Sequence, residues 1–132
     1  MCLIAVTKTH GPDAVEAAYA AGIHDVGENK VQEALDKRAR VTGGATAARW
    51  HMIGHLQSNK VRFLDGFQLV HSVDRTSLAD TISKWGEKRS APIDVLVQVN
   101  VVGEWTKGGT RRRCSRPRRR GSTRCRGSRC VG

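Results

Sequence analysis

The chain has 132 residues and a formal net charge of +11 at pH 7. This length suits one modest domain with a single core, and no apolar run of about 18 residues indicates a membrane span. The positive charge is concentrated at the end of the chain. Residues 1–109 hold 13 Lys+Arg against 12 Asp+Glu, whereas residues 110–132 hold 10 Arg and no acidic residue. The charge therefore does not mark the whole chain as a nucleic-acid-binding domain.

Short apolar runs alternate with helical segments through the first 109 residues. We expect strands at 3–6, 23–26, 50–53, 68–71 and 93–99, and helices at 12–21, 30–41, 56–64 and 75–88. Pro12 and Gly22 mark the two ends of the first helix, and Asp74 is a reasonable N-cap for the last one. This alternation predicts a parallel sheet, and the continuous apolar runs predict strands buried on both faces.

The pattern alone leaves an open doubly wound sheet and a barrel both possible. No G-x-G-x-x-G or G-x-x-x-x-G-K-[ST] motif follows the first strand, which weakens a nucleotide-binding interpretation. In parallel α/β folds, ligands bind at the carboxyl ends of the strands. Polar residues follow or end all five predicted strands: Lys8 and His10, Glu28 and Asn29, His51 and His55, Ser72 and Asp74, and Asn100.

Lys8 is the candidate with the most specific chemistry. It follows an apolar strand, where burial would lower the pKa of its amine and favour the neutral form. A neutral amine can attack an aldehyde and hold it covalently. The position alone favours instead a lysine that extends from the strand end into water.

The histidines and cysteines have structural interpretations. His51 and His55 are four residues apart, as zinc ligands on a helix are, but Gly54 between them suits a strand-to-loop turn and no acidic partner is nearby. We therefore predict no metal site. His51 fits a hydrogen-bonded core residue, His10 and His24 fit the surface, and Cys2 fits a small buried residue. Cys114, Cys125 and Cys130 form no paired zinc-ligand pattern.

Five segments together carry a resemblance to a known family. They are Leu3–His10, Gly27–Glu33, Trp50–Lys60, Val70–Asp74 and Gln98–Asn100. In this order and spacing the chain resembles the pyridoxal-phosphate homeostasis proteins (YggS/PROSC type), which are relatives of the N-terminal barrel of alanine racemase. The resemblance covers about residues 3–109, and the segment 50–60 is its most specific part.

The resemblance implies a partial TIM-type (β/α) barrel of about five parallel strands over residues 1–109. It implies pyridoxal 5′-phosphate at the barrel mouth, bound as a Schiff base on Lys8. It places five further residues around the cofactor: Asn29, His51, Gly54, Ser72 and Asn100. Proteins of this family are not established as catalysts. They are thought to bind the cofactor and deliver it to pyridoxal-phosphate-dependent apoenzymes, so we expect no catalytic residue.

The chain departs from the family in three places, the first of which is that the family usually has a further helix before the first strand. Lys30 stands where the family has Tyr, and the resemblance ends near Gly108 and Gly109. The family continues through three more strand–helix units, which supply its phosphate-binding groups. Residues 110–132 are rich in Arg, Gly, Ser and Cys, and we expect a disordered tail from a frameshifted reading frame. Open sheet edges and the loss of phosphate ligands predict poor solubility and weakened cofactor binding.

Two other functions stay open at this point. An alanine-racemase-like isomerase would use the same lysine, but it needs an opposing base from another domain. The Arg-rich tail could bind nucleic acid nonspecifically through its charge, although it contains no aromatic residue for stacking on bases. The N-terminus lacks a secretory signal, so we expect a cytoplasmic protein without membrane partners.

Overall fold

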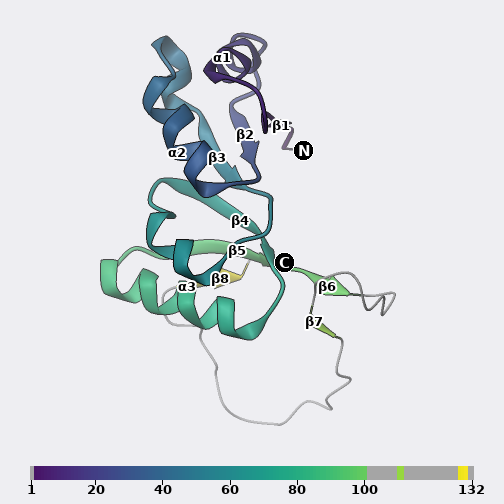
Figure 1. The fold of residues 1–132 in the computed structure, drawn as a ribbon, viewed down its shortest axis with the longest axis vertical. Helices are drawn as coiled ribbons and strands as arrows, with labels where there is room; N and C mark the ends of the chain where they lie inside the picture. Colours follow the sequence, from purple (N-terminus) through teal and green to yellow (C-terminus); the bar gives the residue numbers. More distant parts are fainter. Residues whose placement is uncertain (1, 101–109, 112–127, 131–132) are drawn as a thin grey trace.

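The computed structural model describes residues 2–100, 110–111 and 128–130 (Figure 1). The strands and helices of the first hundred residues follow in alternation, joined by two 3-10 segments, η1 and η2. The elements are β1 (Ile4–Val6), α1 (Pro12–Ala20), β2 (Asp25–Glu28), α2 (Val31–Arg40), η1 (Gly43–Ala47), β3 (Arg49–Met52), η2 (Ser58–Phe63), β4 (Phe67–Val73), α3 (Thr76–Arg89), β5 (Ile93–Val97) and β6 (Val99–Asn100).

Strands β1 to β5 pair in chain order into one parallel sheet. The register aligns Val6 with Gly27, Gly27 with His51, and His51 with Leu69. In Figure 1, α2 lies beside the N-terminal strands and α3 beside β4 and β5. The predicted fold of five parallel strands with intervening helices is confirmed.

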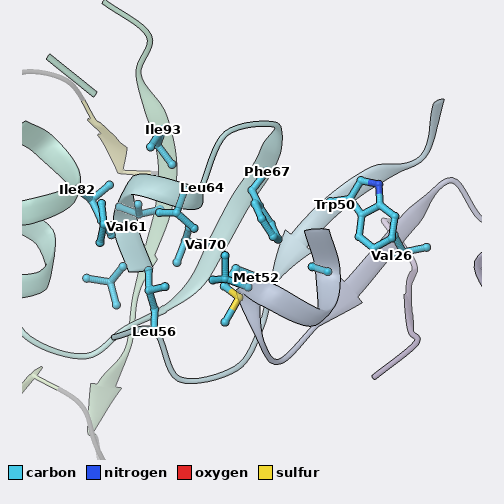
Figure 2. Close-up of a cluster of buried hydrophobic side chains, with 14 of the residues drawn as sticks. Val26, Trp50, Met52, Leu56, Val61, Leu64, Phe67, Val70, Ile82 and Ile93 are labelled. Carbon is cyan, nitrogen blue, oxygen red and sulfur yellow. The ribbon is translucent and has the colours of Figure 1, made fainter. Parts of the chain in front are cut away.

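The core lies between the sheet and its helices. Figure 2 shows Val26, Trp50, Met52 and Val70 of the strands within this cluster. Helix residues complete it, including Val15, Ala34, Leu78 and Ile82. Neighbouring residues of each strand point to the other face of the sheet. Coverage is incomplete at the carboxyl ends of β1 and β5, where Val6 is 53% and Val97 is 46% exposed. The expectation of strands buried on both faces is therefore wrong at these positions.

Four local predictions are corrected by the structure. The second strand begins at Asp25 rather than residue 23, and residues 93–99 divide into β5 and β6, because β5 pairs with β4 up to Val97 while β6 pairs with β7. The predicted helix 56–64 is the shorter 3-10 segment η2, since Ser58 and Asn59 compete with helical hydrogen bonding. The N-cap of α3 is Arg75, without a side-chain hydrogen bond, in place of Asp74.

Two predictions about the chain ends also change. Cys2 is exposed, because β1 starts only at Ile4 and lies at the edge of the sheet. Strands β7 (Thr110–Arg111) and β8 (Ser128–Cys130) occur in the Arg-rich segment, with β7 paired to β6 and β8 parallel to β5. The expectation of no strand there is wrong for those residues. The rest of the predicted disordered tail, 112–127 and 131–132, lies outside the described residues.

None of the helices in the described part of the chain is long and apolar enough to cross a membrane.

Candidate functional site

The carboxyl ends of the parallel strands form one edge of the sheet, which we call the rim. Lys8 follows β1, Asn29 follows β2, and Gly54 follows β3. Ser72 lies one residue before the end of β4. Asn100 ends β6, and its side chain lies outside what the structure describes. Lys8, Asn29, Gly54 and Ser72 thus lie at or next to the carboxyl ends of neighbouring strands, whereas Asn100 is in β6, which pairs with β7 in a separate sheet.

Lys8 is exposed, and within the described residues its amine has no hydrogen-bond or ion-pair partner. The backbone around it is held closely. Thr7 N donates to Gly27 O (3.1 Å), and His10 N donates to Thr7 O (3.1 Å). Thr9 has φ +67°, in the left-handed region that β-branched residues avoid. The side chain is thus accessible while its backbone is constrained, which differs from the dry amine expected from the sequence.

A buried polar network lies directly behind this loop, between the sheet and α2. Glu28 of β2 and Lys37 of α2 are 0% and 1% exposed. Lys37 Nζ donates to Glu28 Oε1 (2.5 Å) and to Thr7 O (2.7 Å), while Thr7 Oγ1 donates to the same Oε1 (2.6 Å). Glu33, one turn before Lys37, accepts from Thr9 N (2.8 Å). Three charged side chains therefore hold the two residues that flank Lys8.

The sequence placed Glu28 at the rim, but it missed Lys37 and Glu33. Arg38, which shares a helix face with Val31 and Ala34 by sequence spacing, is exposed, whereas Lys37 is buried. The available signal was the four-residue spacing of Glu33 and Lys37 on a helix. Glu28 was a second signal, because a carboxylate that is buried beside a strand requires a hydrogen-bond donor from a neighbouring element.

Asn29, Gly54 and Ser72 contact one another at the rim. A Cβ on Gly54 would lie only 2.5 Å from Asn29 Cα, so this contact between two rim loops requires glycine. Ser72 Oγ donates to Gly54 O (2.5 Å), which fixes the same peptide from the β4 side. The three residues form one packed unit of the rim.

His51 lies within β3 rather than at the rim. Its Nε2 is 2.9 Å from Asp25 Oδ1, and its Nδ1 is 3.1 Å from His71 Nε2. If His51 Nε2 donates to the carboxylate, a neutral His51 accepts from His71 at Nδ1. This buried arrangement supports the core alternative that the sequence left open, while a role toward a cofactor stays a prediction.

The same cluster shifts two pKa values. The hydrogen bonds from Arg49 lower the pKa of Asp25 to about 2, opposed by burial and assisted by His51. Burial lowers the pKa of His71, and the charge of His51 lowers it further. Asp25 is therefore a fixed negative charge at the start of β2, which orients the His51 ring.

Both candidate metal-binding histidines do have acidic neighbours, contrary to the sequence-based expectation. His51 contacts Asp25, and His55 Nδ1 lies 3.5 Å from Asp74 Oδ2. The two acids lie on different strand ends, so they serve different histidines. Within residues 2–100 and the described pieces of the tail, no group of three His, Cys, Asp or Glu side chains could hold a metal ion.

A cavity of about 330 Å³ opens at the rim between the N-terminus of α2 and the segment after β3. Met52, Leu56 and Val31 give it an apolar floor, and Lys30 and Lys60 line it with Asn29 and His55. Lys30, at the position where the resemblance expected Tyr, thus places a cation beside the cofactor-binding candidate Asn29.

The chain is similar to known proteins over most of its length. The family model "Alanine racemase, N-terminal domain" matches residues 1–113. The pyridoxal phosphate homeostasis protein of Pseudomonas aeruginosa is 46% identical over 108 residues, covering 81% of this chain and 46% of that protein. The protein of the same description from Aquifex aeolicus is 44% identical over 108 residues, with the same coverage of both chains. This chain therefore spans about half the length of the curated relatives it matches.

Solved structures give the same result. PipY of Synechococcus elongatus without PLP superposes with a TM-score of 0.73 at 38% identity, covering 80% of this chain and 49% of PipY. The structure of PipY with PLP bound gives a TM-score of 0.72 at 36% identity, covering 81% and 50%. The family model over residues 1–113, with the agreement of fold and sequence, shows that the chain belongs to the alanine racemase N-terminal domain family.

Proposed function

We propose that this chain binds pyridoxal 5′-phosphate through Lys8 and acts in the homeostasis of that cofactor rather than in turnover. The observation that carries the proposal is the accessible amine of Lys8 on a constrained loop at the rim. Two comparisons support it. The relatives with the highest identities quoted above are described as pyridoxal phosphate homeostasis proteins, and PipY has been solved with PLP bound.

The described residues fit the aldehyde end of this cofactor. When bound, pyridoxal 5′-phosphate supplies an aldehyde carbon, with which a neutral amine condenses with loss of water. The Lys8 amine has no competing partner in the described part of the chain. Asn29, Gly54 and Ser72 would flank the ring as one packed unit, because Gly54 contacts the first and accepts from the third.

The proposed role ends at binding and delivery. A carrier needs an amine that remains reachable for transfer, and the exposure of Lys8 suits this requirement. We propose pyridoxal-phosphate-dependent apoenzymes as recipients, and the cytoplasm as the compartment in which transfer occurs. Asn100 and His51 remain proposed contacts of the cofactor.

The test compares covalent capture by the full chain and by Lys8→Ala. We expect the unsubstituted chain to develop an absorbance band with pyridoxal 5′-phosphate, and borohydride followed by peptide mapping to label position 8. Lys8→Ala should lose both signals, whereas Lys84→Ala, an exposed lysine on α3, should keep them. Equal bands in the chain and Lys8→Ala, or label found only on other lysines, would refute the proposal.

A further inference from the structure

We propose that Glu33 and Lys37 of α2, with Glu28 of β2, are positioning residues that set the backbone of Lys8 for capture of an aldehyde. This inference rests on the proposed function of Lys8. None of the three side chains needs to touch the cofactor. They act through Thr7 and Thr9, the residues on either side of the lysine.

The first contact point is Thr7, which is 4% exposed. Its carbonyl oxygen accepts from Lys37 Nζ (2.7 Å) and from His10 N (3.1 Å), and its hydroxyl donates to Glu28 Oε1 (2.6 Å). Its N–H donates to Gly27 O (3.1 Å). Every polar group of this residue is therefore engaged, and the peptide that enters Lys8 has one orientation.

The second contact point is Thr9. Its φ of +67° is unfavourable for a β-branched residue, and such a conformation persists only where the surroundings hold it. Glu33 Oε1 accepts from Thr9 N at 2.8 Å, so a carboxylate on α2 fixes the peptide that leaves Lys8. The lysine thus sits between two peptides that are both held by the same helix.

Stability alone does not account for this arrangement. A buried ion pair contributes little net stability, because desolvation offsets its attraction. Here Glu28 Oε1 receives two donors, while the buried Glu28 Oε2 has no hydrogen-bond partner in the described residues. The pair does, however, direct one donor to the Thr7 carbonyl. The geometry points to control of the Lys8 loop as the function of the network.

Lys37 is not a second capturing amine. Its side chain is 2% exposed, and its Nζ lies 2.5 Å from Glu28 Oε1 and 2.7 Å from Thr7 O. An aldehyde cannot reach it without breaking the ion pair. Borohydride trapping with pyridoxal 5′-phosphate should therefore label position 8 and leave position 37 unlabelled.

The experiment uses Glu33→Ala in the full chain, with Glu16→Ala as a matched control. Glu16 of α1 also accepts from a backbone N–H with one carboxylate oxygen, Thr42 N at 2.8 Å, but it holds a loop that does not contain Lys8. Hydrogen bonds to charged acceptors correspond to roughly a tenfold change in an equilibrium constant. We expect Glu33→Ala to bind pyridoxal 5′-phosphate about tenfold more weakly, with Glu16→Ala and Glu33→Gln near the unsubstituted chain.

A second measurement tests the positioning step without cofactor. Amide hydrogen exchange at Thr9 should quicken in Glu33→Ala, should stay unchanged in Glu16→Ala, and should be restored in Glu33→Gln, whose amide oxygen still accepts. Unchanged exchange at Thr9, or equal losses of capture in the Ala variants at positions 33 and 16, would overturn the inference. A lack of capture by the unsubstituted chain would count against the proposed function, and the exchange data would still decide this inference.

Discussion

The buried pair Glu28–Lys37 leads to a quantitative prediction about folding. Lys37→Met keeps most of the aliphatic stem but removes the cation, which leaves Glu28 at 0% exposure without its ammonium partner. Removing one member of a buried ion pair costs roughly 3–5 kcal/mol. Glu28→Gln removes the carboxylate nearest to the Lys37 ammonium, which keeps Glu33 Oε1 at 3.9 Å, so this change should cost less than Lys37→Met but still destabilise the chain.

The double variant Glu28→Gln/Lys37→Met should cost less than either single change. It contains no unpaired buried charge, and a Gln oxygen at position 28 can still accept from Thr7 Oγ1. Thr7 O would lose its bond from Lys37 but keep the one from His10 N. One lost hydrogen bond corresponds to about 1 kcal/mol, so the coupling between the two substitutions should amount to several kcal/mol.

Urea unfolding followed by tryptophan fluorescence measures all four species of this cycle at neutral pH. Distant, independent sites add within about 0.5 kcal/mol. Additive losses at positions 28 and 37 would therefore refute the interpretation of the network as a coupled buried pair. If Lys37→Met is unfolded without urea, recovery of a cooperative transition in the double variant demonstrates the same coupling.

Two further predictions concern Gly54 at the rim and His71 of β4. Gly54→Ala should destabilise the chain by about 1–3 kcal/mol through overpacking, because its Cβ would meet the Asn29 backbone. The control is Gly44→Ala, whose Cβ would meet the Tyr19 ring at 3.3 Å and should change the thermal unfolding temperature little. Equal losses of thermal stability in the two variants would contradict the reasoning. Because the pKa of His71 is lowered in the folded state, the unfolded state binds more protons below pH 6.5. The contribution of His71 to the free energy of unfolding should therefore be fully present above pH 6.5 and be lost as the pH falls. The urea midpoint should fall less on acidification in His71→Gln than in the unsubstituted chain. An unaltered dependence of the midpoint on pH would exclude His71 as the cause of the loss of stability in acid.

Much of the fold could be predicted from the sequence because apolar runs and helix signals recur in one order. Helix α1 occupies Pro12–Ala20 against an expected 12–21, and α3 occupies Thr76–Arg89 against 75–88. The segment after β3 was less predictable. Its apolar residues Leu56 and Val61 are buried, as a helix would require, but the polar residues between them favour a shorter 3-10 conformation.

The sequence predicted the position of the candidate site, but it did not predict the residues and backbone conformation that hold Lys8 in place. Lys8 follows an apolar strand, and that pattern alone predicts a rim residue. The conformation of Thr9 has no sequence signal, because a β-branched residue with φ of +67° contradicts local preference. Lys37 was missed because helical periodicity favours apolar residues on the inner face, and only Glu28, on a different element, makes a buried lysine acceptable there.

The location of the Glu28, Glu33 and Lys37 network explains how the backbone around Lys8 can be held although parts of the sheet are exposed. The network uses β1, β2 and α2 on the helix side, where the core is buried, whereas Val6 and Val97 at the strand ends remain exposed. The Lys8 backbone is therefore fixed by contacts among residues 7–37 that do not depend on what covers the other face. Because these contacts hold the backbone while the amine has no partner among the described residues, the lysine can stay open to a small molecule while its peptide is held in place.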